Sequence, residues 1–292
     1  MADSLDAIRN RIEGANDLQG VVRTMKAMSA SSITQYENAV LALSSYYETV
    51  QQGLTACFKD LNSGPLLLPN SKAKKTAAVI VFGSDQGLVG QFNDTLAEYL
   101  NEHLGEIGPK LKVWVVGERM KGQLEDANLT IQGYFNVPST VDSVTHLIGK
   151  LLIATEHLWG IDLQSPIYLC HHKPGRQMGQ YAPAMRTLLP IDSAWQKNLQ
   201  SQVWKGPSLP QTLGTNALTL RALIREYLFV SIYQSSAESL ASENASRLMS
   251  MQRAEKNIEE MLADLQRAYH QQRQESIDAE LFDVLAGYTS GK

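Results

Sequence analysis

The sequence has 292 residues and a formal net charge of −4, which argues against a general nucleic-acid binder, because such proteins are usually basic. It has no run of 18 or more apolar residues, so no membrane-spanning helix is expected, and its N-terminus lacks the basic and apolar regions of a secretory signal. The two cysteines, Cys57 and Cys170, predict neither a disulfide framework nor a zinc site, and a reducing cytoplasm is expected.

Residues 3 to about 60 are predicted to form one long helix with a coiled-coil seam. Seam positions alternate at steps of three and four for about seven heptads, well beyond the three or four that make such a pattern credible. The seam consists of Leu5, Ile8, Ile12, Ala15, Gln19, Val22, Lys26, Ser29, Ile33, Tyr36, Val40, Leu43, Tyr47, Val50, Leu54 and Cys57.

Three positions of this seam, Gln19, Lys26 and Ser29, are polar and lie close together. One explanation is a polar patch that sets the register of the coil; the other is that a second protein grips the coil at this level. Gly14 and Gly20 also leave two explanations open, either tolerance by a well-packed coil or close approach of a neighbouring backbone.

A different pattern begins at Thr76, where short β-branched runs alternate with helical segments. This alternation predicts a mostly parallel sheet covered on both faces, and Pro190 marks an expected edge strand at 186–190. Residues 192–211 are expected to link back to a helix. The expected strands are 77–82, 112–117, 130–135 and 166–171, and the expected helices are 92–104, 120–126 and 141–159.

Residues 212–285 are predicted to form a second long helix, since they contain no proline and are rich in helix-forming residues. An apolar stripe is expected at Leu248, Met251, Ile258, Met261, Leu265 and Ala268. A helix of roughly 75 residues would be about 110 Å long, so it needs a partner, and the first helix is the candidate.

The expected fold class is therefore α/β, with a long antiparallel coiled coil of N- and C-terminal helices and an inserted Rossmann-like α/β domain. The expected boundaries are 1–60 for the first helix, 76–192 for the α/β domain and 211–286 for the second helix. Because the second helix is longer by about 20 residues, one of its ends should project alone.

Candidate catalytic sites in this sequence are weak. Gly83–Gly90 follows a strand and precedes a helix, as a phosphate-binding turn would, but it fits neither the dinucleotide nor the phosphate-loop pattern. We expect its glycines to serve a tight connection. His171 and His172 should point to opposite faces of a strand and share no metal. No catalytic, cofactor-binding or metal-binding residue is predicted.

Arg273 and Gln274 lie near the C-terminal end of the second helix, between Tyr269 and Ile277. They are either part of a solvated helix face or, at an unpaired tip, donors that grip carboxylates or carbonyls of a surrounding partner.

Both ends of the chain resemble the gamma subunit of rotary F-type ATP synthases. The C-terminal likeness is the more specific and covers Ser239–Met251, Asn257, Leu265, Tyr269, Arg273-Gln274, Ser276-Ile277 and Glu280-Leu281. The N-terminal likeness is carried by Ile8-Arg9, Ile12, Gln19 and Met25, and the middle of the chain matches at Asp85, Gly87, Leu88 and Gly90.

The sequence departs from the family pattern in places. Ser29-Ala-Ser-Ser-Ile33 stands where the family has Ala-Ala-Ser-Lys-Met, His270 stands where an Asn is usual, and the plant-type regulatory cysteine pair is absent. These departures suggest a divergent bacterial branch.

The resemblance implies the central rotor shaft of an F-type ATP synthase, which is a non-catalytic subunit without a cofactor. The implied partners are the alpha and beta catalytic subunits, the epsilon subunit and a membrane ring of proteolipid subunits, with no nucleic acid and no direct membrane insertion. The implied location is peripheral, at the cytoplasmic face of a bacterial inner membrane. The implied partner-contact residues are Met25, Arg247, Arg273 and Gln274.

The competing hypothesis is an enzyme or a tether, in which the coiled coil merely dimerises an α/β domain. An enzyme would need a pocket with convergent titratable groups, and the sequence indicates none clearly. A shaft would co-purify with nucleotide-binding subunits, whereas an enzyme or tether would not.

Overall fold

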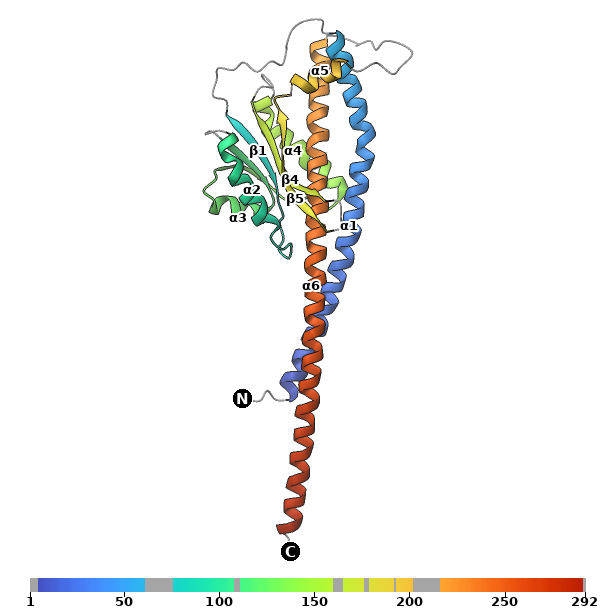
Figure 1. Ribbon diagram of the computed structural model, residues 1–292, viewed down its shortest axis with the longest axis vertical. Helices are drawn as coiled ribbons and strands as arrows, with labels where there is room; N and C mark the ends of the chain where they lie inside the picture. The colour runs from blue at the N-terminus through green and yellow to red at the C-terminus, as the bar shows by residue number, and fades with distance from the viewer. Residues whose placement is uncertain are drawn as a thin grey trace. The chain divides into compact units, whose positions relative to one another are not determined.

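The computed structural model describes residues 5–60, 76–107, 111–159, 165–175, 179–191, 193–201 and 216–290. Two very long helices enclose an α/β region in the sequence (Figure 1). The elements are α1 (Leu5–Asp60), β1 (Ala77–Phe82), α2 (Phe92–Ile107), β2 (Leu111–Val116), α3 (Glu118–Asp126), β3 (Ile131–Phe135), α4 (Val141–Trp159), β4 (Ile167–Pro174), β5 (Tyr181–Leu189), α5 (Ser193–Ser201) and α6 (Asn216–Ser290).

The chain divides into two compact units, to which α1 and α6 each contribute a segment. One unit comprises Met1–Ser29 and Arg247–Lys292, and the other comprises Ala30–Ser246. We call them the shaft unit and the sheet unit.

The sheet unit contains a five-stranded mixed sheet with the strand order β3-β2-β1-β4-β5. Strand β1 pairs in parallel with β2 and β4, and β2 pairs in parallel with β3. Strand β5 lies antiparallel to β4 at the edge and ends just before Pro190, which has no N–H to donate to a ladder. The predicted, mostly parallel sheet with an edge strand at this place is therefore confirmed.

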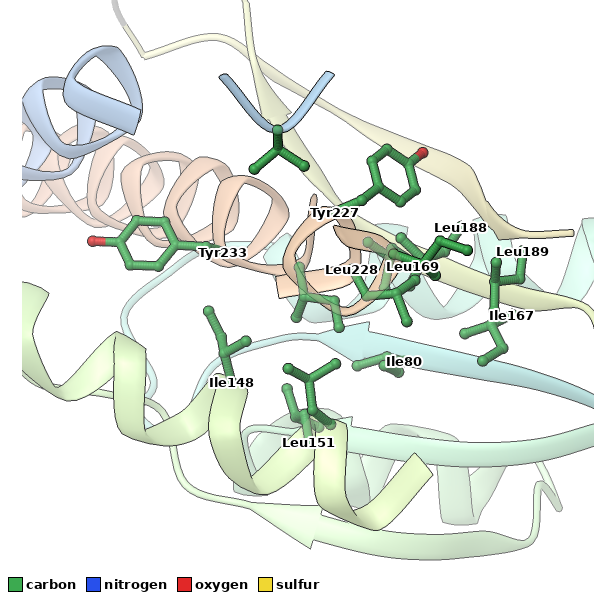
Figure 2. Close-up of a cluster of buried hydrophobic side chains, with 14 of the residues drawn as sticks. Ile80, Ile148, Leu151, Ile167, Leu169, Leu188, Leu189, Tyr227, Leu228 and Tyr233 are labelled. Carbon is green, nitrogen blue, oxygen red and sulfur yellow. The ribbon is translucent and has the colours of Figure 1, made fainter. Parts of the chain in front are cut away.

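The two faces of the sheet carry separate apolar cores, because successive strand residues point to opposite sides. Val79 and Val81 of β1 pack with α2 and α3, whereas Ile80 and Phe82 pack with α1, α4 and α6. Figure 2 shows this second core, where Ile148 and Leu151 of α4 and Leu228 of α6 meet Ile80, Ile167 and Leu169 of the sheet. Each such buried side chain contributes roughly 1.5–3 kcal/mol.

Helices α1 and α6 run antiparallel within each unit. In the shaft unit Arg23 contacts Glu255, and in the sheet unit the Tyr46 hydroxyl donates to Glu226 Oε2 at 2.7 Å. Every predicted seam position of α1 is buried or half-buried, which confirms the seam.

The glycines of α1 behave differently from one another. A Cβ at Gly14 or Gly20 would meet nothing within 4 Å, so these two are tolerated rather than approached closely. The close approach is instead at Gly53, where a Cβ would lie 2.9 Å from Leu223 Cδ2 of α6.

Three details differ from expectation. Residues 193–201, which were expected to be a linker, form α5, and β5 begins earlier than predicted, at Tyr181. In α6, Met261 is 53% exposed and Ala268 is exposed, so assigning them to the apolar stripe was wrong. The buried row passes through Leu262 and Tyr269 instead, one residue further along, and the error arose because Met261 and Leu262 are both apolar.

Candidate interaction surface

The crevice of the sheet that could hold a ligand is filled by α6. In open α/β sheets, ligands bind at the carboxyl ends of the strands where the strand order reverses, which is here between β1 and β4. Ser239 Oγ donates to the carbonyl oxygen of Phe82 at 3.1 Å, and Ser242 Oγ donates to that of His172 at 3.3 Å. Ser246 Oγ donates to the carbonyl oxygen of Val89. Small hydroxylated side chains thus seat the helix where a nucleotide would lie.

The glycine turn after β1 is a structural connection, as expected. Asp85 Oδ1 accepts the backbone N–H of Glu118 and Oδ2 accepts that of Val137, both at 2.8 Å. The carboxylate therefore caps α3 at its N-terminus, where an anion would bind, and ties three loops together. Within the turn, a Cβ at Gly83 would lie 2.2 Å from Met120 Cβ of α3, so this glycine serves the close connection.

His171 and His172 point to opposite faces of β4, as predicted. His171 Nε2 lies 2.9 Å from Glu238 Oε2 of α6, and His172 Nε2 lies 2.8 Å from the carbonyl oxygen of Phe92 on α2. Both histidines are fully buried, and burial lowers the pKa of His172 to about 4. Across the described residues, no group of three or more His, Cys, Asp or Glu side chains could hold a metal ion.

No helix in the described part of the chain is both long and apolar enough to cross a membrane.

Lys26, one of the three polar seam positions of α1, shares a carboxylate of α6 with the neighbouring Arg23. Glu255 Oε1 lies 2.9 Å from Arg23 Nε, and Lys26 Nζ donates to Glu255 Oε2. These side-chain hydrogen bonds lower the pKa of Glu255, and the one from Lys26 has the larger effect. Because Lys26 is paired within the coil, the arrangement supports the register-setting explanation for this position.

A second apolar row runs along α1, outside the seam. Leu18, Val21 and Met28 are 60%, 56% and 66% exposed, and Met25 between them is half-buried. The steps from Leu18 to Val21, Met25 and Met28 are three, four and three, so the four lie on one helix face. We call them the outer stripe. Sequence reasoning singled out only Met25, although the same spacing rule could have found the other three.

The other expected contact residues lie on α6. Arg247 is half-buried, whereas Arg273 and Gln274 are exposed, and the structure does not bring these three together with Met25 into one cluster. Beyond them α6 continues past the start of α1 (Figure 1). Its apolar side chains there are 53–71% exposed; they are Ile277, Leu281, Phe282, Val284 and Leu285. We call residues 277–285 the tip.

Comparison with protein families gives one match that spans nearly the whole chain. The family model described as ATP synthase matches residues 4–290. The ATP synthase gamma chain of Anaeromyxobacter dehalogenans (strain 2CP-C) is 26% identical over 292 residues, which cover 97% of this chain and 98% of the relative. The chain belongs to the ATP synthase gamma chain family. The gamma chain of Actinobacillus succinogenes is 27% identical, with 96% of each chain covered.

Chains in solved structures of ATP synthase assemblies share the fold. A chain of the Euglena gracilis mitochondrial ATP synthase, solved with OSCP, F1 and the c-ring, matches 98% of this chain with a TM-score of 0.67 and 15% identity. A chain of the Tetrahymena thermophila central stalk and c-ring matches 80% of this chain with a TM-score of 0.58 and 18% identity.

Membership of the gamma chain family fixes the general role of the protein. It is a non-catalytic rotor subunit, the central stalk of an F-type ATP synthase. The filled crevice agrees with this role, because the α/β region uses its ligand position to hold its own C-terminal helix.

Proposed function

We propose that α1 and α6 turn as a shaft inside a hexamer of alternating alpha and beta catalytic subunits. Ion flow through a membrane ring of proteolipid subunits drives the turn, and the shaft's asymmetry forces the catalytic sites through different states. The observation that carries this proposal is the outer stripe. It is a row of apolar side chains on a helix whose seam is already filled by α6, so it is free to meet another protein.

The finer organisation follows from the same proposal. The proposed division is a first shaft helix at 1–60, an α/β domain at 76–192 and a second shaft helix at 211–286; residues 1–4 and 211–215 of the two helices lie outside the described residues. The α/β domain stands on the proteolipid ring beside the epsilon subunit. The complex is peripheral to the cytoplasmic face of a bacterial inner membrane, without insertion of this chain and without nucleic acid.

Four residues are proposed to contact the catalytic subunits. Met25 lies in the outer stripe, where a flexible thioether side chain adapts to a surface that slides past it. Arg247, Arg273 and Gln274 make the polar contacts of α6 with loops of the surrounding subunits. Exposed Arg273 and Gln274 have their donors available for such contacts.

The alternative, an enzyme or tether dimerised by its coiled coil, is disfavoured by two observations. The seam of α1 is covered by α6 of the same chain, so it offers no second copy a dimer interface. The ligand crevice of the sheet is also occupied.

The test uses variants of Met25 in chains that have been assembled into the complex with the alpha and beta subunits. Met25→Lys places a cation in the outer stripe, where it can bond to polar groups of the surrounding subunits and resist rotation. We expect ATP hydrolysis to continue while ATP-driven ion transport per ATP falls. The control Met25→Leu keeps the stripe apolar and should preserve both. An unchanged transport-to-hydrolysis ratio in Met25→Lys, or failure of the chain to co-purify with alpha and beta subunits, would contradict the proposal.

A further inference from the structure

Glu255 is a charged residue at a seam position of α6. The buried or half-buried row of α6 in the shaft unit proceeds at steps of three and four, and Glu255 is its third member; the row is Leu248, Met251, Glu255, Ile258, Leu262, Leu265, Tyr269, Gln272 and Ser276. The Glu255 side chain is only 15% exposed. A polar residue at a seam position weakens a coiled coil but specifies its register.

The cationic partners of Glu255 favour one register of α1 on α6. Each carboxylate oxygen is paired with a different cation. Oε1 accepts a hydrogen bond from Arg23 Nε at 2.9 Å, and Oε2 accepts one from Lys26 Nζ. Arg23 and Lys26 are three residues apart on one face of α1. Arg23 also lies 3.6 Å from Glu259 Oε1.

Within the shaft unit, the apolar seam by itself does not distinguish registers that differ by a heptad, because a slip of seven residues again sets seam positions against seam positions. The charges do distinguish them. A slip of one heptad would place Asn16 and Gln19, or Ala30 and Ile33, opposite Glu255 in place of Arg23 and Lys26. None of these four side chains is cationic, so the carboxylate would be left in the seam without a counter-charge.

We infer that Glu255 is the positioning residue that selects the register of α1 on α6 in the shaft unit. The register in turn fixes the axial position of the outer stripe along α6 and the direction in which its side chains point. Only this last consequence rests on the proposed rotor function; the choice of register is a property of the chain alone.

The test measures register directly in the full-length chain, using spin labels on Asn10→Cys of α1 and Gln266→Cys of α6. Both positions are exposed, whereas the native Cys57 and Cys170 are buried. A one-heptad slip moves one helix along the other by about 10 Å. The parent chain should give one narrow distance distribution, and Glu255→Lys, which sets three cations together, should add a shifted or broadened population.

Two further variants separate register from stability. Glu255→Leu fills the seam with an apolar side chain, so thermal stability should stay equal or rise while the distance distribution broadens. Combined Arg23→Glu, Lys26→Glu and Glu255→Arg reverses the charges and should restore the narrow distribution. Glu259→Gln removes only the more distant, exposed carboxylate and should leave the distribution narrow.

The distance measurement decides the inference. Narrow, unshifted distributions in both Glu255→Lys and Glu255→Leu would overturn it, whatever the complex does. Coupled ion transport in complexes that carry the same variants tests the rotor proposal separately. Broadened distances with unchanged coupling would uphold the register role and contradict the proposed contact of the outer stripe.

Discussion

The Nε2 atom of His172 lies 2.8 Å from the carbonyl oxygen of Phe92, and the two rings of these residues are 4.4 Å apart. The contact joins strand β4 to the start of helix α2 inside a core that excludes water. A protonated imidazole would be costly there, since burial is the main cause that lowers the pKa of His172 to about 4.

The burial of His172 predicts that the folded chain is sensitive to acid. Between about pH 6.5 and pH 4 the unfolded chain binds a proton at His172 and the folded chain does not, so stability falls as the pH falls. From pH 7 to pH 5 this residue should cost about 2 kcal/mol. His172→Gln cannot titrate and should flatten the pH dependence by that amount in denaturant unfolding of the purified chain. Parallel pH profiles for the two proteins would contradict the assignment.

Asp85 should be needed for the stability of the sheet unit. Its two oxygens accept the N–H groups of Glu118 and Val137, and hydrogen bonds to a charged group contribute about 1.5–3 kcal/mol. Asp85→Ala should therefore destabilise the chain by about 3 kcal/mol, measured by chemical denaturation. Asp85→Asn retains one oxygen acceptor and should lose about half as much. Equal losses of unfolding free energy in the two variants would show that the hydrogen bond retained by Asp85→Asn contributes nothing to stability.

Substitutions at Ser239 test how tightly α6 packs in the crevice. Ser239→Ala removes one hydrogen bond to Phe82 and should cost about 1 kcal/mol. Ser239→Leu must displace the end of β1 as well, and overpacking adds about 1–3 kcal/mol. Thermal unfolding of the two variants gives the comparison. If Ser239→Leu were as stable as Ser239→Ala, the crevice would have room that the structure does not show.

The tip should matter more for assembly than for coupling. A single helix bends more easily than a paired coil, and its exposed apolar side chains would be buried in a surrounding collar at roughly 1.5–3 kcal/mol each. Deletion from Asp278 onward should lower the yield and thermal stability of the complex and leave coupled transport in the complexes that form. If complexes with the deletion assembled normally but lost coupled transport, the tip would be the part of the shaft that transmits torque, and this prediction would be wrong. The double substitution Arg273→Ala with Gln274→Ala keeps the apolar tip but removes two proposed polar contacts, and it should impair assembly or turnover.

The sequence was sufficient to predict the α1 seam, because its heptad pattern is regular from Leu5 to Cys57 and one partner helix covers it. It was less informative for α6. Between Ile224 and Ser246 that helix is covered on nearly all sides, so its burial has no simple period and includes serines such as Ser236 and Ser242. Ser239 and Ser242 are buried with their hydroxyl groups donating to backbone carbonyl oxygens of Phe82 and His172.

The candidate surface was only partly predictable for a similar reason. Spacing along α1 could have grouped Leu18, Val21 and Met28 with Met25, since all four lie on one helix. The pairing of Glu255 with Arg23 and Lys26 depends on the register of α1 on α6, and these residues are 232 and 229 positions apart in sequence. No local pattern contains that register, so this contact required the three-dimensional structure.

The hydrogen bond between Ser239 and Phe82 spans 157 positions of the chain, and this has a consequence for biosynthesis. Translation proceeds at about 5–20 residues per second, so the newly made α1 waits on the order of 10–50 s before most of α6 has been synthesised. During that interval the seam of α1 and one face of the sheet remain uncovered. The ribosome-bound chain therefore exposes these apolar side chains until α6 has been synthesised.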